Sequence, residues 1–412
     1  MADYTLLHTS DWHLGQHFYG KTREAEHRAI IDWLVEQVAA HQVDAVVIAG
    51  DVFDTATPPS YARECYLSMV ARLSACGCQL VVLGGNHDSV AVLNESRSVA
   101  TALKAHVIAD LHDDLESHVI ELKSRDGETG AVLCALPFIR SRSISVSEEG
   151  ETGREKGLQL MEGISKVYHA VYDIATQRAN QAGDSLSIIG TGHLTTFGAS
   201  RSESERDIYI GGLDTFPAED FPAFDYLALG HIHRPQRVAG KEHWCYSGSP
   251  LPLSFDEASN EKSVSLVRIE GGSLSVEKLI VPRTQQLVQL KGDLDSVFEQ
   301  ISELAPEQPI WLDIEVESDG HLHDLQQRLT EQLEDTRAEL LLLRRRRVAG
   351  VQVLSGGVAD ESLHELSVID VFRRRLDTLD DTDDERLTER KKRATELFQQ
   401  VVGSLEHGYE NS

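Results

Sequence analysis

The sequence is poor in cysteine, in basic residues and in long apolar runs, and each shortage excludes a class of protein. Its 412 residues include five cysteines, an odd number without Cys-x-x-Cys spacing. We therefore expect reduced thiols rather than a disulfide framework or a structural zinc site. No apolar stretch approaches the roughly 18 residues that a membrane span needs, and the first residues lack the pattern of an export signal. These absences predict a cytoplasmic protein that does not act in a membrane.

Positive charge is also scarce. The chain has 39 Lys and Arg against 67 Asp and Glu, a formal net charge of -28. This balance argues against a protein that binds nucleic acid through a strongly basic surface. It does not exclude a local basic groove, and bound divalent cations invert the sign of the field at a site. A partner chain can also carry much of the affinity for nucleic acid.

The first ninety residues alternate strand-like and helical patterns. Apolar runs at 4–9, 43–49 and 80–83 are separated by helical periodicity at 24–41 and 58–73. This alternation predicts a largely parallel sheet with helices outside it. Each run stops at a polar cluster that contains Asp, His or Asn. Because open α/β sheets place their ligands at the carboxyl ends of strands, these clusters are candidate site residues.

Two later segments, 187–193 and 226–233, repeat the same arrangement of apolar strand, glycine and histidine. In the second, we expect Gly230 to provide the backbone bend that aims His231 and His233 at one point. Further strand patterns at 119–122, 131–135, 244–247 and 264–269, with a long helix at 155–182, predict a second sheet, closed by its last two strands. The expected fold class is α/β, with two packed mixed sheets flanked by helices.

The strand ends together supply seven candidate metal ligands. Carboxylate, amide and imidazole groups without a thiolate suit Mn²⁺ and, less distinctively, Mg²⁺ or Fe²⁺. Seven ligands are too many for one ion with an open position, but they suit two ions roughly 3.5–4 Å apart that share a carboxylate. Asp51 is the natural bridge, since its segment supplies one near ligand. The candidates are Asp11, His13, Asp51, Asn86, His193, His231 and His233.

Three neighbouring residues have other expected roles. His87 follows a candidate ligand and is positioned to protonate a leaving oxygen or to stabilise charge on a phosphorus centre, so it is the candidate catalytic residue. Asp88 is expected to hold an imidazole in one tautomer. Asp54 is interpreted as a supporting or helix-capping residue rather than a ligand.

The joint pattern resembles a known family. Asp11-x-His13, Gly50-Asp51-x-x-Asp54, Gly85-Asn86-His87-Asp88, Gly192-His193 and Gly230-His231-x-His233 are similar, in order and spacing, to the five motifs of calcineurin-like dinuclear metallophosphoesterases. Segments 8–15, 58–63, 193–196 and 247–250 resemble the SbcD family of nuclease subunits within this group. The resemblance implies one ion held by Asp11, His13, Asp51 and His233. It implies a second held by Asp51, Asn86, His193 and His231, with His87 as the catalytic histidine.

The resemblance also implies an activity and partners. The implied activities are Mn²⁺-dependent 3′–5′ exonuclease action on double-stranded DNA ends and endonuclease action on single strands and hairpins. The implied role is in DNA repair, recombination and replication near the nucleoid. The implied assembly is a homodimer, and a heterotetramer with an SbcC-type coiled-coil ATPase. One position departs from the pattern, because eukaryotic and archaeal relatives carry His where this chain has Asp54. A leaving-group role of that histidine is therefore not carried over.

The pattern predicts four parts of the chain. Residues 1–282 form the nuclease domain and 283–345 a small α+β cap, to which the resemblance gives a role in shaping the DNA groove. Residues 346–362 form a linker, and 363–412 a tail of two amphipathic helices. These helices could pack as a hairpin on the body of the protein, but their position after a linker favours binding to the ATPase. The basic run Arg344 to Arg347 has two open interpretations: a solvated charged surface, or contacts with phosphate or with the partner.

Two other functions compete with the nuclease. A phosphodiesterase or phosphatase acting on small nucleotides or phosphoproteins has the same metal chemistry, but it needs only about the first 280 residues. A structural scaffold with an inactive site is the second alternative. The complete set of ligands argues against it, since loss of Asp51, Asn86 or His231 is what an inactive site predicts.

Overall fold

The computed structural model describes residues 3–144, 152–182, 186–205, 215–304, 309–318, 322–334 and 336–346. Residues 347–362 of the expected linker and the two tail helices lie outside the described residues, whereas Arg346, expected as the first linker residue, is described. The chain divides into two compact units. The first comprises Met1–Gln289, Leu304–Asp313 and Leu333–Leu342, and the second comprises Leu290–Glu303, Ile314–Gln332 and Leu343–Ser412.

The first unit contains a six-stranded sheet with the strand order β14-β13-β1-β4-β5-β6. The strands are β1 (Tyr4–Thr9), β4 (Ala45–Ala49), β5 (Gln79–Leu83), β6 (Ala105–Ile108), β13 (Ser263–Glu270) and β14 (Ser273–Ile280). Strands β1, β4, β5 and β6 run parallel, as the alternating pattern predicts. Strand β13 pairs antiparallel with β1, and β14 continues that edge as a hairpin.

One strand lies in a different sheet from the one that the sequence predicts. The segment 264–269 was expected to close the second sheet, but β13 extends the first sheet beside β1. Buried residues lie on both faces of this strand, so its sequence marks no solvent-facing side that would assign it to one sheet. Only the pairing with β1, about 260 residues earlier in the chain, decides its place, and local sequence does not encode this pairing.

The second sheet has the order β11-β12-β10-β9-β8-β7. Its strands are β7 (Val119–Lys123), β8 (Thr129–Cys134), β9 (Ser187–His193), β10 (Tyr226–Gly230), β11 (Gln236–Arg237) and β12 (Trp244–Tyr246). Strands β8, β9, β10 and β12 run parallel, and the two edge strands are antiparallel. This sheet is therefore mixed, as expected.

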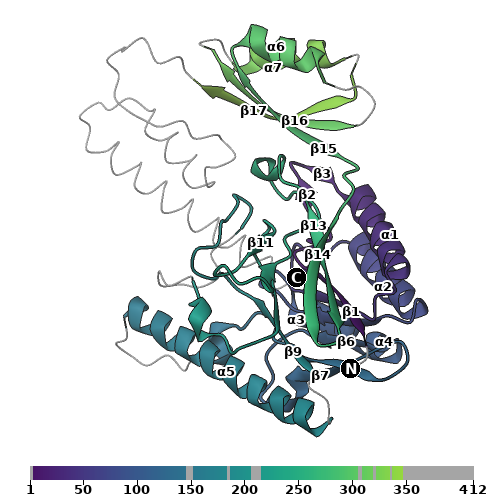
Figure 1. Cartoon of the computed structure of the whole chain (residues 1–412). Helices are drawn as coiled ribbons and strands as arrows, with labels where there is room; N and C mark the ends of the chain where they lie inside the picture. The colour runs from purple at the N-terminus through teal and green to yellow at the C-terminus, as the bar shows by residue number, and fades with distance from the viewer. Residues whose placement is uncertain are drawn as a thin grey trace. The chain divides into compact units, whose positions relative to one another are not determined.

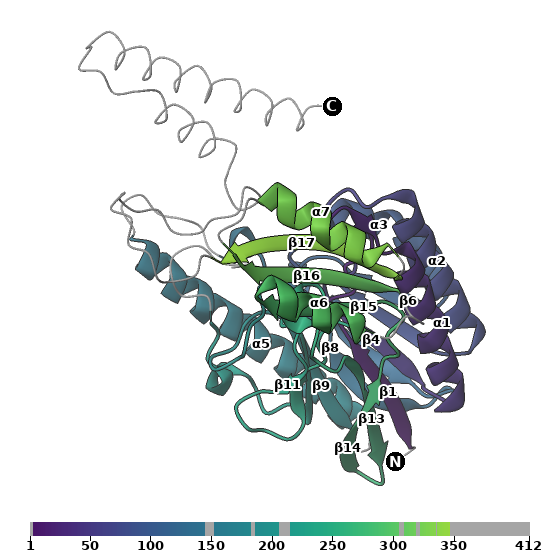
Figure 2. The same ribbon diagram turned by 90° about the horizontal axis from the view of Figure 1, so that it is seen from above.

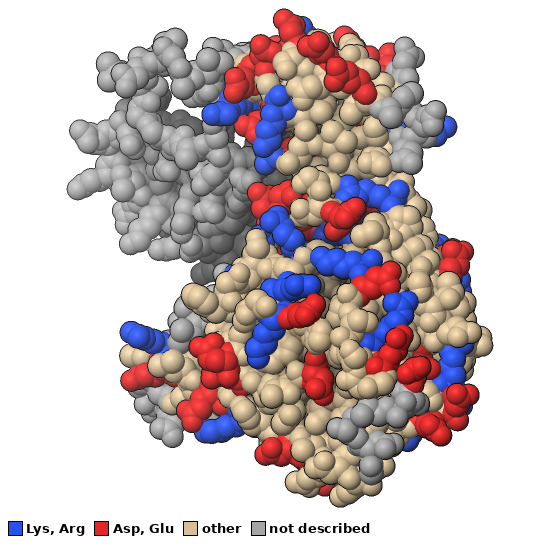
Figure 3. All heavy atoms as spheres, in the orientation of Figure 1, with Lys and Arg blue, Asp and Glu red and all other residues tan. Residues whose placement is uncertain are grey.

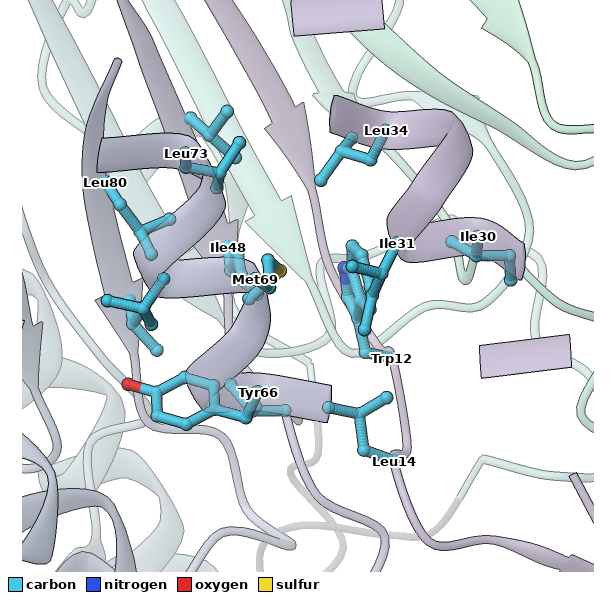
Figure 4. Close-up of a cluster of buried hydrophobic side chains, with 14 of the residues drawn as sticks. Trp12, Leu14, Ile30, Ile31, Leu34, Ile48, Tyr66, Met69, Leu73 and Leu80 are labelled. Carbon is cyan, nitrogen blue, oxygen red and sulfur yellow. The ribbon is translucent and has the colours of Figure 1, made fainter. Parts of the chain in front are cut away.

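Helices cover the outer face of each sheet (Figure 1 and Figure 2). Helices α1 (Glu24–Ala40) and α2 (Ser60–Ala75) lie on the first sheet. Figure 4 shows Ile30, Ile31 and Leu34 of α1 and Tyr66, Met69 and Leu73 of α2 packed with side chains of the strands. The long helix α5 (Gly153–Gln181) covers the second sheet. A capping box of Thr152 and Glu155 fixes its start.

A separate apolar layer lies between the two sheets. Inward-facing side chains of β1, β4 and β5 meet those of β8, β9 and β10, among them Leu6, Val47, Leu133, Ile189 and Tyr226. The resulting order of layers is helices, sheet, sheet, helix, which confirms the predicted fold class. Two short helices, α3 (Val90–Glu95) and α4 (Arg97–Ala102), and a small hairpin, β2 (His17–Phe18) with β3 (Lys21–Thr22), complete this part. No helix of the described residues is long and apolar enough to cross a membrane.

The segment after residue 283 contains the three-stranded sheet β15-β16-β17 and two helices. Their bounds are β15 (Gln286–Gly292), α6 (Leu294–Ser302), β16 (Ile310–Glu317), α7 (Leu322–Leu333) and β17 (Ala338–Arg346). The sequence pattern predicts a strand at 310–316, a helix at 322–333 and a strand at 338–343, followed by the basic run. These match β16, α7 and the start of β17, whereas β15 and α6 are not predicted. The basic run was expected after the strand, whereas Arg344 to Arg346 continue β17. Arg346 lies 3.5 Å from Glu317 on the neighbouring strand.

Candidate metal centre

The candidate site residues lie at the carboxyl ends of five parallel strands in the first unit. Asp11 and His13 follow β1, Asp51 follows β4, and Asn86 and His87 follow β5. His193 is the last residue of β9, and His231 and His233 follow β10. Strands β1, β4 and β5 are neighbours in one sheet, and β9 and β10 are neighbours in the other. The predicted residues therefore come together where the two sheets end side by side.

The backbone at this place is strained. Asp11, His13, Asp51 and His231 all have positive φ angles, of 54°, 44°, 49° and 90°. Such angles cost a non-glycine residue free energy on the order of 1–3 kcal/mol and cluster at functional sites. Hydrogen bonds between the loops hold the geometry: the Asp11 N–H donates to the carbonyl of Gly50 at 3.0 Å, and the His13 N–H to that of Asp51 at 3.1 Å.

Gly230 has a role that differs from the one expected. The backbone bend lies at His231, whose φ is 90°, and Gly230 is not among the residues with positive φ. A Cβ atom on Gly230 would lie 2.0 Å from the carbonyl oxygen of Ala49 in the other sheet. The glycine is needed because the two sheets approach closely at this point, and not because of backbone freedom.

The side chains form groups with the spacing of metal ligands. Asp11, His13 and His233 have donor atoms within 4.8 Å of one another, and so do Asp51, His193 and His231. All six are buried. A third group joins His13 to Asp54 and His87. The assignment of these residues as ligands stays a prediction, but their geometry is that of two adjacent sites.

Asp51 lies between the two groups. Its Oδ2 atom is 3.2 Å from Nε2 of His193 in one group and 3.7 Å from Nε2 of His13 in the other. Its second oxygen, Oδ1, accepts a hydrogen bond of 2.9 Å from the backbone N–H of His87. This position is the one that a bridging carboxylate requires.

The electrostatics of the centre call for a cation. No Lys or Arg lies within ion-pairing distance of Asp11 or Asp51 among the described residues. Burial by itself lowers the pKa of His193, but the Asp51 and Asp11 carboxylates together raise it to about 9. Burial by itself raises the pKa of Asp51, but His193, His13 and His87 hold it well below its usual range. Imidazoles are thus the nearest titratable partners of these buried carboxylates, and a divalent ion bound there would supply the compensating positive charge.

The imidazoles are oriented as metal ligands. Nδ1 of His193 faces the carbonyl oxygen of Ala49 at 2.9 Å, and Nδ1 of His13 faces Oδ1 of Asp54 at 3.0 Å. Because both partners only accept, Nδ1 of each ring carries a proton, and the opposite nitrogen, Nε2, turns toward the centre. The Nε2 atoms of His13 and His231 are buried without a hydrogen-bond partner. Orphaned acceptors aimed into a cluster of carboxylates fit a metal site.

Asn86 and His87 lie at the edge of the centre. Oδ1 of Asn86 is 2.9 Å from Nε2 of His193, so the amide belongs to the same group as Asp51 and His193. The His87 ring lies edge-on to His13, with ring centroids 4.8 Å apart. Its Nδ1 donates to the backbone carbonyl of Asp54 at 2.8 Å. Both residues are half-buried, which leaves this edge accessible to a substrate.

Asp88 has a different role from the one predicted. Instead of an imidazole, its carboxylate accepts hydrogen bonds from the backbone N–H groups of Val52, Phe53 and Gly85, at 2.9–3.1 Å. It therefore ties together the loops that follow β4 and β5. Burial, and then the charge of Asp51, raise the pKa of this carboxyl group to about 6.

Sequence reasoning missed the residues that support His233. Glu205 and Ser204 come from the loop after β9, and Glu257 and Lys262 from the segment before β13. None of them belongs to a motif or follows a strand end. A buried Glu or Lys is uncommon, but burial is not visible in the sequence.

The charge of the first unit is not gathered in one region of its visible face. Figure 3 shows basic and acidic side chains interspersed over the described residues of this face. The net charge of -28 therefore does not produce a continuous acidic surface there.

Comparison with known proteins places this site in a family. A family model described as calcineurin-like phosphoesterase matches residues 4–235, more than half of the chain. The SbcD subunit of nuclease SbcCD from Escherichia coli strain K12 is 51% identical over 390 residues, which cover 93% of this chain and 95% of that protein. The chain is a calcineurin-like phosphoesterase of the SbcD family. Members of this family use divalent metal ions, in agreement with the donor groups described above.

Other relatives of the SbcD family are more distant. The SbcD subunit of nuclease SbcCD from Rhodobacter capsulatus is 34% identical and covers 74% of this chain and 77% of its own. The Bacillus subtilis strain 168 protein of the same name is 33% identical, with coverages of 76% and 78%. A second family model, described as the type 5 capsule protein repressor C-terminal domain, matches residues 283–379. The similarity thus extends past the phosphoesterase part.

Proposed function

We propose that this chain is the metal-dependent DNA nuclease subunit of an SbcCD-type complex. Its reactions are 3′–5′ exonuclease cleavage of double-stranded ends and endonuclease cleavage of single strands and hairpins, in DNA repair, recombination and replication near the nucleoid. One observation carries the proposal: Asp51 lies between two buried groups of metal-competent side chains, in a chain 51% identical to a protein named as part of a nuclease.

The metal ions are proposed to be two Mn²⁺. The first is held by Asp11, His13, Asp51 and His233, and the second by Asp51, Asn86, His193 and His231. The absence of thiolate among these donors favours Mn²⁺ over Zn²⁺. When bound, the ions polarise the phosphodiester and activate the attacking water.

His87 is the proposed catalytic residue. Two hydrogen bonds hold it at the edge of the centre, one from its N–H to Asp51 Oδ1 and one from its Nδ1 to the Asp54 carbonyl. This anchoring places the ring beside His13, half-exposed, where a scissile phosphate enters. Its role is to pass a proton to the leaving oxygen as the bond to phosphorus breaks.

The experiment compares DNA with small phosphoesters as substrates. Purified chain is incubated with a DNA hairpin and a blunt duplex, with and without Mn²⁺, beside a chromogenic phosphodiester and a phosphomonoester. We expect Mn²⁺-dependent cleavage of both DNA substrates and none by Asp51→Ala. Turnover of the small esters with DNA untouched, even when the ATPase is added, would instead indicate a phosphodiesterase or phosphatase for small nucleotides or phosphoproteins.

The proposed division of the chain is a nuclease domain at 1–282, a cap at 283–345, a linker at 346–362 and a tail at 363–412 that binds an SbcC-type ATPase. The printed name of the relatives, which makes them part of an SbcCD nuclease, supports such a partner. Deletion of residues 360–412 is expected to abolish co-purification with the ATPase while Mn²⁺-dependent cleavage remains. Co-purification of the truncated chain would assign the binding site to another segment.

The proposed homodimer has a candidate contact surface on α2 and α4. A groove of about 330 Å³ is lined in part by Phe53, Tyr66, Leu67, Val92 and Val99. Leu67 and Val99 of this lining are 43% and 52% exposed, so the groove offers apolar surface to a partner. A second copy of the chain is the proposed occupant. Leu67→Glu is expected to convert the dimer to a monomer in light scattering, whereas a dimer of unchanged mass would rule out this surface.

A further inference from the structure

A buried ion pair lies behind His233, in a position that neither a motif nor the proposed reaction explains. Glu257 is fully buried and Lys262 is 3% exposed. The Lys262 ammonium group donates to Oε2 of Glu257, and it also donates to Oγ of Ser249 and to the backbone carbonyl of His233, each at 2.9 Å. All three ammonium hydrogens thus have an acceptor. The carboxylate remains charged inside the protein because the ammonium group compensates it.

The hydrogen bonds from this carboxylate to His233 run through Ser204, whose Oγ also lies 2.9 Å from Oγ of Ser202. Oε1 of Glu257 lies 2.6 Å from Oγ of Ser204, and a charged carboxylate only accepts, so the Ser204 hydroxyl donates. The same Oγ lies 2.6 Å from Nδ1 of His233. With its hydrogen already used, Ser204 accepts there, and Nδ1 of His233 must carry a proton. The lone pair of the ring is then on Nε2.

The backbone of His233 is held as firmly as its ring. Its N–H donates to Oε1 of Glu205 at 2.7 Å, and its carbonyl accepts from the Ser249 N–H at 3.1 Å as well as from Lys262. Together with Ser204, these contacts fix the position of the residue from both sides. The imidazole has no room to turn without breaking a buried hydrogen bond.

We infer that Ser204 and Glu257 are positioning residues for His233, which they hold in the Nδ1–H tautomer so that Nε2 faces a divalent cation beside Asp11 and His13. Lys262 keeps the charge of Glu257 in place. This inference rests on the proposed function, in which His233 is a metal ligand. A purely structural ion pair would stabilise the fold equally well but would not select a tautomer.

The test uses two serines of the same loop. Ser202 also donates to Oε1 of Glu257, at 2.8 Å, and its Oγ lies 2.9 Å from Oγ of Ser204. No hydrogen bond joins Ser202 to His233 among the described contacts, so it is the control that touches the same carboxylate without supporting the ring directly. Binding of Mn²⁺ to metal-free protein is measured by calorimetry. Ser204→Ala is expected to weaken one of the two Mn²⁺ sites by about tenfold to a hundredfold, the usual effect of removing a support behind a ligand.

The control variants separate positioning from folding. Ser202→Ala is expected to change Mn²⁺ affinity by less than about twofold, well below the effect of losing a support behind a ligand. Ser204→Thr keeps the hydroxyl and is expected to restore wild-type affinity. All three proteins should unfold at nearly the same temperature without metal. Equal losses of affinity in the Ser202 and Ser204 variants would contradict the inference.

A second readout does not depend on metal. In metal-free protein with ¹⁵N-labelled histidine, the His233 signals, assigned with His233→Asn, should show the proton on Nδ1. In Ser204→Ala this preference should disappear. An Nε2–H tautomer in the wild type would overturn the inference. If the wild type binds Mn²⁺ and shows the Nδ1–H tautomer but cleaves no DNA, the proposed nuclease function fails while the positioning role stands.

Discussion

The two halves of the candidate metal centre are supported in different ways. In the half around Asp51 and His193, the imidazole is oriented by a backbone carbonyl of a core strand, Ala49. In the half around His13 and His233, the imidazoles are oriented by side chains, Asp54 and Ser204. Main-chain support cannot be removed by substitution, whereas side-chain support can. The second half is therefore the one in which substitution of a supporting side chain is expected to change metal affinity without changing a proposed ligand.

Removal of the carboxylate common to both halves should have the largest effect. Asp51→Ala leaves both groups of imidazoles without their shared anion, so we expect the loss of both Mn²⁺ ions in calorimetry. Nuclease activity should fall by at least about a hundredfold, because the charge that organises the site is gone. Retention of two ions by this variant would show that Asp51 does not join the halves.

Removal of the proposed catalytic histidine should leave both halves intact. His87→Ala is expected to bind Mn²⁺ with unchanged stoichiometry and to lose cleavage by about a hundredfold to ten-thousandfold, the usual contribution of a proton-transferring residue. Parallel calorimetry and cleavage of a DNA hairpin check this. Substantial residual cleavage would remove His87 from the reaction.

Removal of one side-chain support should affect one half only. Asp54→Ala frees Nδ1 of His13, and we expect one Mn²⁺ site to weaken by about tenfold or more while the other keeps its affinity. Resolved binding steps in calorimetry measure the two sites separately. A parallel loss at both sites would show that the halves are not independently supported.

The smallest expected effect is on the pH dependence of folding stability, and it comes from a histidine outside the metal centre. His8 lies between the sheets with Nδ1 2.8 Å from the Tyr226 hydroxyl, and burial lowers its pKa to about 3. Since its folded pKa is below the unfolded value of 6.5, its stabilising contribution is present above pH 6.5 and is lost as pH falls toward 3. Between pH 7 and 5 this amounts to about 2 kcal/mol.

The measurement is the free energy of unfolding by denaturant, for metal-free wild type and metal-free His8→Gln, at pH 7 and at pH 5. The variant should have a free energy of unfolding that depends less on pH, by about 2 kcal/mol over this range. The same pH dependence in both proteins would mean that folding does not lower the pKa of His8.

The sequence predicted most of the first sheet because its strands and helices carry strong periodicity. Helix α1 was expected at 24–41 and spans Glu24–Ala40, and strand β9 spans Ser187–His193 as expected. The assignment of β13 to the second sheet was wrong, because a strand that is buried on both faces fits either sheet. The apolar strand expected just before Pro282 is the end of β14, whereas β15, an edge strand with a weak pattern, was missed.

The candidate ligands could be found because each follows a strand end, and parallel strands bring their ends together. The interactions that fix the geometry of these ligands could not be found from the sequence. The left-handed backbone at Asp11, His13 and His231 is imposed by hydrogen bonds between loops, and the need for Gly230 comes from the carbonyl of Ala49 in the other sheet. Ser204 and Glu257 reach His233 through tertiary hydrogen bonds, and they come from loops that contain no motif.

The most direct test of the account is anomalous diffraction from a crystal of this chain grown with Mn²⁺. The account predicts two peaks roughly 3.5–4 Å apart on either side of Asp51, one beside Asp11, His13 and His233 and the other beside His193 and His231. A single peak, or two peaks that do not share Asp51, would contradict the dinuclear centre on which the proposed nuclease function depends.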